Sequence, residues 1–263
     1  MNSKVQPAFT FGENWLQFST TLDSDRVRSA EESMRSLLQR PRLDGLTFLD
    51  LGAGSGLFSI AALRLGAARV IAIDRDHNCL KAIRRNVERL ATPDESRRIE
   101  LRLGDVLDPA TLPTEKFDVV YAWGSLHHTG SMWQAVTNAG ACVRDGGLFA
   151  IAIYNSTRSS PLWHRIKRIY HGSPSWARTG MVAALTGVRA AVRLSRFKRP
   201  FRVERGMSVW YDAVDWLGGL PYEYATSAEV DAFLNDRGFQ TVHHVLTNRS
   251  GCNEFLCRRD SPL

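Results

Sequence analysis

The chain has 263 residues and a formal net charge of +7, and 44% of its residues are hydrophobic and 23% charged. This composition is typical of a soluble globular protein that is long enough to bury a full core. Its four cysteines are scattered without a Cys-x-x-Cys pair, so the sequence indicates neither a disulfide framework nor a zinc site. Residues 1–7 contain no apolar signal segment, and no apolar run reaches membrane-spanning length, so we expect a cytoplasmic protein.

The predicted elements begin with an aromatic stretch at 9–15 and a helix at about 23–39. Strands and helices then alternate, which predicts a parallel sheet with helices on both faces. The expected order is strand 46–52, helix 56–66, strand 69–74, helix 77–91, strand 99–105, strand 117–123, helix 131–144 and strand 148–154. Residues 144–147, with two glycines, are expected to end the helix before the last of these strands.

Three further helices are expected beyond residue 156, at 162–171, 175–197 and 207–217. A final helix at 226–237 is predicted from an N-cap at Thr226 or Ser227 with Glu229 nearby, and strands follow at 240–247 and 253–258. We therefore divide the chain into an N-terminal cap segment (1–44), a core (45–155), a helical insert (156–225) and a C-terminal return to the core (226–263).

The most informative stretch of the core is a glycine-rich turn between its first strand and first helix. Glycines 52, 54 and 56 permit positive φ angles and let a ligand approach the backbone closely. The next strand ends at Asp74, whose carboxylate can accept hydrogen bonds from both hydroxyls of a ribose. The pattern predicts a site for a cofactor that contains adenosine, although the dinucleotide fingerprint would require glycine where Leu57 stands.

Two later motifs identify the cofactor. The third strand ends in Gly104-Asp105, and the fourth strand begins with Phe117-Asp118-Val119-Val120. Together with the glycine loop and Asp74, these features resemble the class I S-adenosylmethionine-dependent methyltransferases. Over residues 46–155 the resemblance extends loosely to bacterial small-molecule and ubiquinone-type O-methyltransferases.

The resemblance implies a Rossmann-like, seven-stranded, mostly parallel α/β sheet whose last two strands form a hairpin with one antiparallel strand. It implies S-adenosyl-L-methionine as the cofactor and no metal. The residues expected to bind the cofactor lie in or beside the four motifs: Asp50, Gly52, Ala53, Gly54, Gly56, Asp74, Arg75, Asp105, Val106 and Trp123.

Two histidines follow the fourth strand, His127 and His128. A histidine at this place can take the proton from a hydroxyl or amine that attacks the methyl group. Adjacent side chains point in different directions, so we expect at most one of the two to face the substrate. A merely structural histidine is the alternative for each.

The insert concentrates the positive charge of the chain. Residues 156–210 contain twelve Lys or Arg and one acid, so the rest of the chain is negative overall. We expect a lid helix with a solvated cationic face; a membrane-surface helix and a phosphate-binding surface are the alternatives. Asp212 and Asp215 are expected on a solvated helix face. Aromatic residues of both non-core segments are expected to cap an acceptor pocket: Phe11, Trp15, Tyr170, Trp210 and Tyr211.

The sequence therefore predicts a methyltransferase that acts on oxygen or nitrogen of a small metabolite. One alternative keeps the cofactor but cyclises its aminobutyrate arm, as azetidine-2-carboxylate synthases do. A second is an RNA or carrier-bound substrate, and a third is a non-catalytic binding module. We expect no appreciable RNA binding, and neither the acceptor nor the oligomeric state can be derived from the sequence.

Overall fold

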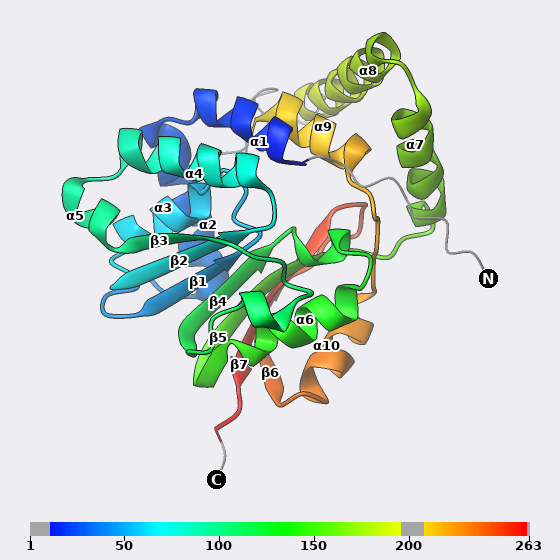
Figure 1. Cartoon of the computed structure of the whole chain (residues 1–263). Helices are drawn as coiled ribbons and strands as arrows, with labels where there is room; N and C mark the ends of the chain where they lie inside the picture. Colours follow the sequence, from blue (N-terminus) through cyan, green and yellow to red (C-terminus); the bar gives the residue numbers. More distant parts are fainter. Residues whose placement is uncertain (1–10, 196–207, 262–263) are drawn as a thin grey trace.

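A computed structural model describes residues 11–195 and 208–261 of the protein (Figure 1). Seven strands form one sheet in the order β3-β2-β1-β4-β5-β7-β6. All neighbouring strands from β3 to β5 pair in parallel, whereas β7 pairs antiparallel with both β5 and β6. The predicted fold class, including the C-terminal hairpin, is confirmed. The strands are β1 (Thr47–Leu51), β2 (Arg69–Asp74), β3 (Ile99–Leu103), β4 (Phe117–Trp123), β5 (Val143–Tyr154), β6 (Phe239–Val245) and β7 (Cys252–Arg259).

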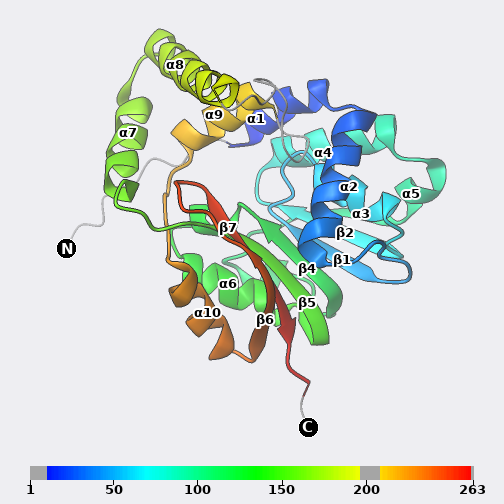
Figure 2. The ribbon, with the colours of Figure 1, turned by 180° about the vertical axis from the view of Figure 1, so that it is seen from behind.

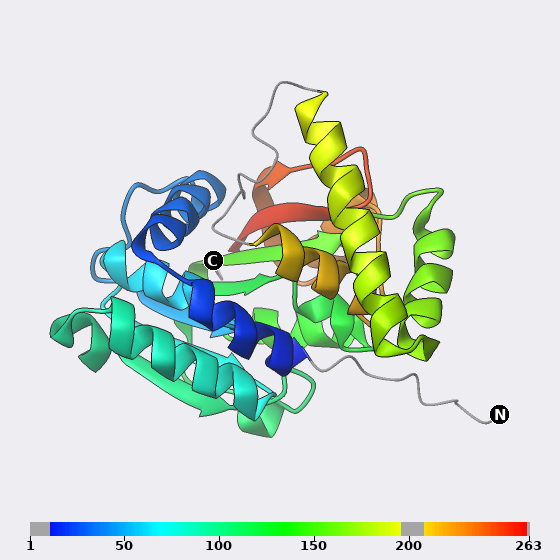
Figure 3. The same ribbon diagram turned by 90° about the horizontal axis from the view of Figure 1, so that it is seen from above.

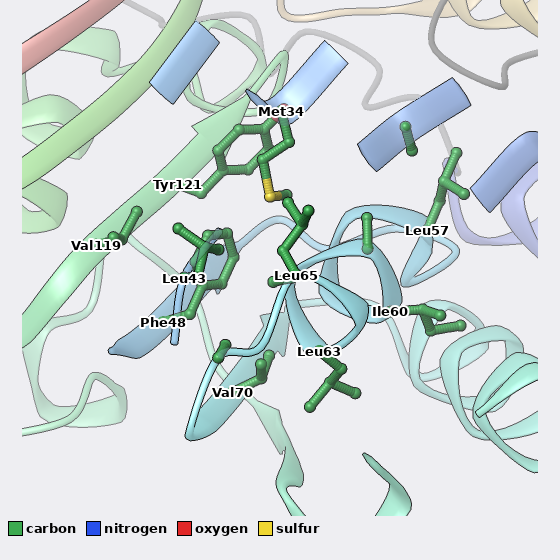
Figure 4. Packing of buried hydrophobic residues seen from close by; sticks show 14 of the residues in the cluster. Met34, Leu43, Phe48, Leu57, Ile60, Leu63, Leu65, Val70, Val119 and Tyr121 are labelled. Carbon is green, nitrogen blue, oxygen red and sulfur yellow. The ribbon is translucent and has the colours of Figure 1, made fainter. Parts of the chain in front are cut away.

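Helices cover both faces of this sheet because successive strand residues are buried on opposite sides. On one face, Phe48 and Val70 pack against α2 (Ser24–Leu38), α3 (Leu57–Arg64) and α4 (His77–Leu90). Figure 4 shows Met34 of α2 beside Tyr121 and Leu43 beside Phe48, with Leu57, Ile60 and Leu63 of α3 in the same cluster. On the other face, Leu49 and Ile71 pack against α6 (Met132–Ala141) and α10 (Ser227–Asn235). Figure 1 shows α6 and α10 in front of the sheet, and Figure 2 shows α2 on its other side.

Four helices lie beyond the carboxyl ends of the parallel strands. They are α1 (Phe11–Phe18) from the N-terminal segment and α7 (Ser160–Gly172), α8 (Ser175–Leu194) and α9 (Val209–Gly218) from the insert. Figure 3 shows α1, α9 and α8 side by side when the molecule is viewed from above. α1 contacts both α4 and α9, and α9 contacts α7 and α8. Segments about two hundred residues apart therefore meet above the sheet.

Most predicted elements agree with the structure, and the differences have local causes. Thr226 caps α10 in a capping box with Glu229, as expected. The short helix α5 (Pro93–Arg97) has the same capping box at Thr92 and Glu95 but was not predicted. No helix in the described part of the chain is long and apolar enough to cross a membrane.

The stretch 144–147 is the main correction to the predicted elements. We expected it to end a helix, but α6 already ends at Ala141 and these residues belong to β5. The register between β4 and β5 jumps from Phe117 opposite Val143 to Val119 opposite Leu148, and Gly146 has a φ of 70°. The glycines accommodate an irregularity inside a strand, because only glycine adopts this conformation at little cost.

Candidate functional site

A cavity of about 640 Å³ opens at the carboxyl ends of β1, β2, β4 and β5. One wall, here called the sheet side, comes from the loops that follow these strands and includes Asp50, Gly54, Asp74, Trp123 and His127. The opposite wall, the helix side, comes from α1, α8 and α9. Its residues are Phe11, Trp15, Arg189, Asp212, Asp215 and Trp216. In open parallel sheets, ligands bind at this edge.

The glycine loop sits tightly between neighbouring elements. Gly52 has a φ of 75°, and a Cβ there would lie 2.4 Å from Cβ of Ser125. A Cβ on Gly54 would lie 3.1 Å from the Trp15 ring of α1. Gly56 is not among the lining residues, and a Cβ there would lie 2.8 Å from Ile83 of α4. Gly52 and Gly54 therefore shape the cavity, whereas Gly56 lets α3 and α4 approach each other.

Two buried carboxylates stand beside this loop. Oδ2 of Asp74 accepts a hydrogen bond from the Gly54 N–H at 2.9 Å, and Oδ1 accepts one from the Asp76 N–H at 3.0 Å. Oδ2 of Asp50 accepts one from the Ser59 hydroxyl at 2.6 Å. Burial raises the pKa of Asp74 and raises that of Asp50 to about 7. A cationic or hydrogen-bond-donating ligand beside these groups would favour their ionised forms.

His127 and His128 both border the cavity, and each is fixed in one tautomer. Nδ1 of His127 lies 3.2 Å from the Ala152 carbonyl oxygen, and Nδ1 of His128 lies 2.8 Å from that of Pro221. A carbonyl only accepts, so each Nδ1 carries the proton and each Nε2 presents a lone pair. Burial lowers both pKa values, that of His128 to about 3, so both rings are neutral at pH 7.

The surroundings of the two rings differ. His128 packs against the Phe11 ring at a centroid distance of 4.9 Å, and its Cε1–Nε2 edge lies against Gly219. The His127 ring packs against the Tyr154 ring at a centroid distance of 3.9 Å and an interplanar angle of 41°, and its buried Nε2 has no hydrogen-bond partner among the described residues. A buried acceptor without a partner is costly, so a ligand donor would stabilise this site.

On the helix side, polar contacts join α1 to the insert. The Asn14 amide donates hydrogen bonds to Oδ1 of Asp215 at 2.7 Å and to the Tyr211 carbonyl at 3.2 Å. Arg189 of α8 donates to Oδ2 of Asp212 at 2.6 Å. Asp215 is therefore held inside the helix side and not on the solvated face expected for it, whereas the Asp212 side chain stays 48% exposed beside Arg189. Burial raises the pKa of Asp215 well above its ordinary value.

A buried lysine supports the aromatic wall, and sequence reasoning missed it. The Lys167 ammonium lies over the rings of Tyr222, Trp216 and Tyr154 at 4.7, 5.1 and 5.6 Å and donates to the Trp216 carbonyl. Burial lowers its pKa to about 7. Its helical spacing from Trp163 and Tyr170 places it on the buried stripe of α7, and this signal was available in the sequence.

Several predicted site residues lie away from the cavity. Asp105 forms an ion pair with Arg75 at 3.9 Å, and Arg75 is the member of that pair that lines the cavity. Val106 packs against the core on the α6 side of the sheet. Tyr170 is buried inside the insert, Tyr211 packs on Phe18, and Trp210 is exposed. Within the described residues, no group of three or more His, Cys, Asp or Glu side chains could hold a metal ion.

Comparisons with known proteins agree with this geometry. Residues 48–147 match the family model described as a methyltransferase domain. An 81-residue stretch is 47% identical to the ribosomal protein L11 methyltransferase of Escherichia coli (strain 55989 / EAEC), and covers 30% of this chain and 25% of that protein. A 118-residue stretch is 33% identical to the ubiquinone biosynthesis O-methyltransferase of Methylobacterium sp. (strain 4-46), and covers 45% of each chain. The chain thus spans only a quarter to a half of the curated relatives it matches.

Solved structures extend the likeness beyond the matched segment at the level of the fold. A magnesium protoporphyrin IX methyltransferase from Synechocystis PCC 6803, determined with bound SAH, superposes with a TM-score of 0.56 at 15% identity. The alignment covers 89% of this chain and 83% of that one. An O-methyltransferase family protein from Burkholderia thailandensis gives a TM-score of 0.56 at 16% identity, and covers 95% of this chain and 59% of that one.

Proposed function

We propose that this chain, whose residues 48–147 form a methyltransferase domain, is an S-adenosylmethionine-dependent methyltransferase that acts on oxygen or nitrogen of a small molecule. The observation that carries the proposal is a single cavity that is lined by the glycine loop, by Asp74 and by His127, whose buried Nε2 has no hydrogen-bond partner among the described residues. A cofactor site and a proton acceptor thus share one cavity.

The sheet side fits the cofactor. Gly52 and Gly54 leave the loop without side chains where it borders the cavity, and the buried carboxylates of Asp74 and Asp50 can pair with ribose hydroxyls and an ammonium group. When bound, S-adenosylmethionine supplies a methyl group on a sulfonium, which is electrophilic enough that positioning provides much of the acceleration. Asp74, Asp50 and the loop therefore orient the cofactor toward the helix side.

His127 is suited to receive the proton that the acceptor loses. Its Nε2 is unprotonated because Nδ1 donates to the Ala152 carbonyl, and its depressed pKa keeps the ring neutral. A hydroxyl or amine that enters the cavity would give Nε2 its missing donor and would be held for attack. His128, whose Nδ1 hydrogen-bonds the Pro221 carbonyl and whose ring packs against Phe11, positions the loop.

The helix side favours a small, partly aromatic acceptor over RNA. Phe11, Trp15 and Trp216 of this side offer ring surface to a bound acceptor, and Tyr154 of β5 adds to it. Arg189 is engaged by Asp212 and therefore is not available as a free phosphate contact. The names of the matched relatives point to both a protein and a quinone precursor as acceptors, and the matched domain model, residues 48–147, does not include the insert.

The first test separates methyl transfer from cyclisation of the cofactor. The purified protein is incubated with S-adenosylmethionine alone, and the cofactor is followed by mass spectrometry. We expect it to stay nearly intact, since the enclosed site supplies no acceptor. Rapid release of methylthioadenosine would instead favour the cyclising alternative. A panel of phenols and amines with labelled cofactor then identifies the acceptor class, and failure to label any of them would argue against a small-molecule acceptor.

A further inference from the structure

The outer surface of α7 and α8 exposes large apolar side chains. Leu162 and Ile169 of α7 are 58% and 61% exposed, and Trp176 and Val188 of α8 are 78% and 60% exposed. Between Trp176 and Val188, the exposed residues of α8 include Gly180, Ala183, Ala184 and Gly187. At helical spacing these residues form an uncharged face along α8, opposite the Val182 and Leu185 side that packs against the rest of the insert.

The same two helices carry positive charge without any compensating acid. Residues 156–195 contain seven Lys or Arg and no Asp or Glu. Two of the seven are used inside the protein: Lys167 is buried, and Arg189 pairs with Asp212. Four others are exposed: Arg158 just before α7, Arg165 and Arg168 on α7, and Arg178 at the start of α8, on the side of Val182. This surface therefore combines exposed apolar groups with unneutralised guanidinium groups.

Within the described residues, this surface lies at the edge of the molecule. Figures 1 and 3 show α7 and α8 there, on the opposite side from α2–α5. Arg178 fixes the corner between the two helices by donating to the carbonyls of Ser173 at 2.8 Å and His171 at 3.2 Å. These hydrogen bonds join the start of α8 to the end of α7.

We propose that the outer face of α7 and α8 binds the surface of an anionic lipid bilayer. A bilayer interface accepts apolar side chains, favours tryptophan at the headgroup level and attracts arginine through acidic headgroups. Two other partners, RNA and a second copy of this chain, would fit this face less well. An RNA backbone would pair with the arginines but would leave Trp176 and Val188 without apolar contacts. A second copy would bring its own arginines against these, with no acid on the face to neutralise them. The membrane surface would lie beside the helix side of the cavity.

Sedimentation with lipid vesicles tests the proposal. The wild-type protein should sediment at physiological salt with mixed phosphatidylglycerol and phosphatidylcholine vesicles, and much less with pure phosphatidylcholine vesicles. The double variant Trp176→Glu with Val188→Glu should reduce the partition coefficient about tenfold or more. The matched control is Val242→Glu, because Val242 is 46% exposed on the distant strand β6, and it should partition as the wild type does.

Charge-reversal variants test separately whether the arginines attract acidic lipid headgroups. Arg165→Glu with Arg168→Glu should remove the preference for phosphatidylglycerol, whereas Arg97→Glu on α5 should not. Affinity for S-adenosylhomocysteine should be unchanged in all variants, because none of these residues lines the cavity. The proposal is overturned if the wild type stays in the supernatant with anionic vesicles, or if the Trp176/Val188 variant partitions normally. It is also overturned if the wild type is a dimer that this variant dissociates, or if it binds RNA more tightly than vesicles.

Discussion

The two walls of the cavity are built in different ways. On the sheet side, the partners are close in sequence: Asp74 accepts from Gly54, twenty residues away, and Asp50 from Ser59, nine residues away. On the helix side, Asn14 and Asp215 are 201 residues apart, and Arg189 reaches Asp212 across a helix pair. The first wall is a property of consecutive strand-loop-helix units. The second exists only when α1, α8 and α9 pack together above the sheet.

The two walls therefore correspond to the two tasks of a transferase, which are to hold the cofactor and to bind the acceptor. The sheet side can hold a common cofactor in many proteins because its geometry is local, and residues 48–147 match a domain model shared with other methyltransferases. The helix side lies outside that match and can vary without disturbing the cofactor wall. We therefore expect changes on one wall to affect cofactor affinity and changes on the other to affect the acceptor.

The largest effect is expected at Asp74. Asp74→Ala removes a buried acceptor of charge-assisted hydrogen bonds and should weaken S-adenosylhomocysteine binding by about 2–4 kcal/mol. Titration calorimetry measures this difference, with Asp108→Ala as the control because Asp108 only caps the 3-10 turn at Pro109–Thr111. If a folded Asp74→Ala protein keeps the wild-type affinity, the sheet side does not hold the ribose.

A slightly smaller effect is expected at His127, where the two walls meet. His127→Gln replaces the basic imidazole with a non-basic amide and should lower kcat on the order of 100-fold while the affinity for S-adenosylhomocysteine is retained. His128→Gln is the matched variant and should cost less, because that ring already packs against Phe11 and Gly219. If kcat fell equally in both variants, the two histidines would only hold the loop in place, and neither would accept the proton.

The same division explains what could be predicted from the sequence. β2 and β4 were predicted with their observed bounds, and Asp74 and the glycine loop were located, because strand periodicity and turn chemistry are local signals. Tyr170, Trp210 and Tyr211 were expected at the acceptor pocket, but the packing of α9 onto α1 and α7 turns other side chains toward it. Trp216 and Asp215 of α9 line the cavity in their place. Which face of an insert helix points inward is a tertiary property that the sequence pattern does not determine.

Lys167 offers a test of the helix side through stability. The unfolded chain holds the lysine proton up to the ordinary pKa of 10.5, whereas the folded protein releases it above about 7. Between these values the unfolded state binds more protons, so the free energy of unfolding should rise with pH. From about pH 7 to about pH 9, the wild type should gain about 2 kcal/mol relative to Lys167→Met.

Urea denaturation at several pH values measures this gain. The control is Lys81→Met on the exposed side of α4, which should follow the wild-type profile. If the free energy of unfolding of Lys167→Met changes with pH as that of the wild type does, the Lys167 ammonium is not desolvated by the rings of Tyr154, Trp216 and Tyr222.

The smallest effect is expected at the contact that joins the two ends of the chain. Asn14→Ala removes the hydrogen bonds to Asp215 and to the Tyr211 carbonyl, and should cost about 1 kcal/mol of stability. It should also raise KM for the acceptor severalfold, because Asp215 and Trp216 are then held less firmly, while cofactor affinity stays unchanged. Gln17→Ala, an exposed position on the same helix, is the control. If Asn14→Ala weakened S-adenosylhomocysteine binding and spared the acceptor, α1 would belong functionally to the cofactor wall, with Trp15 on Gly54 as its point of contact.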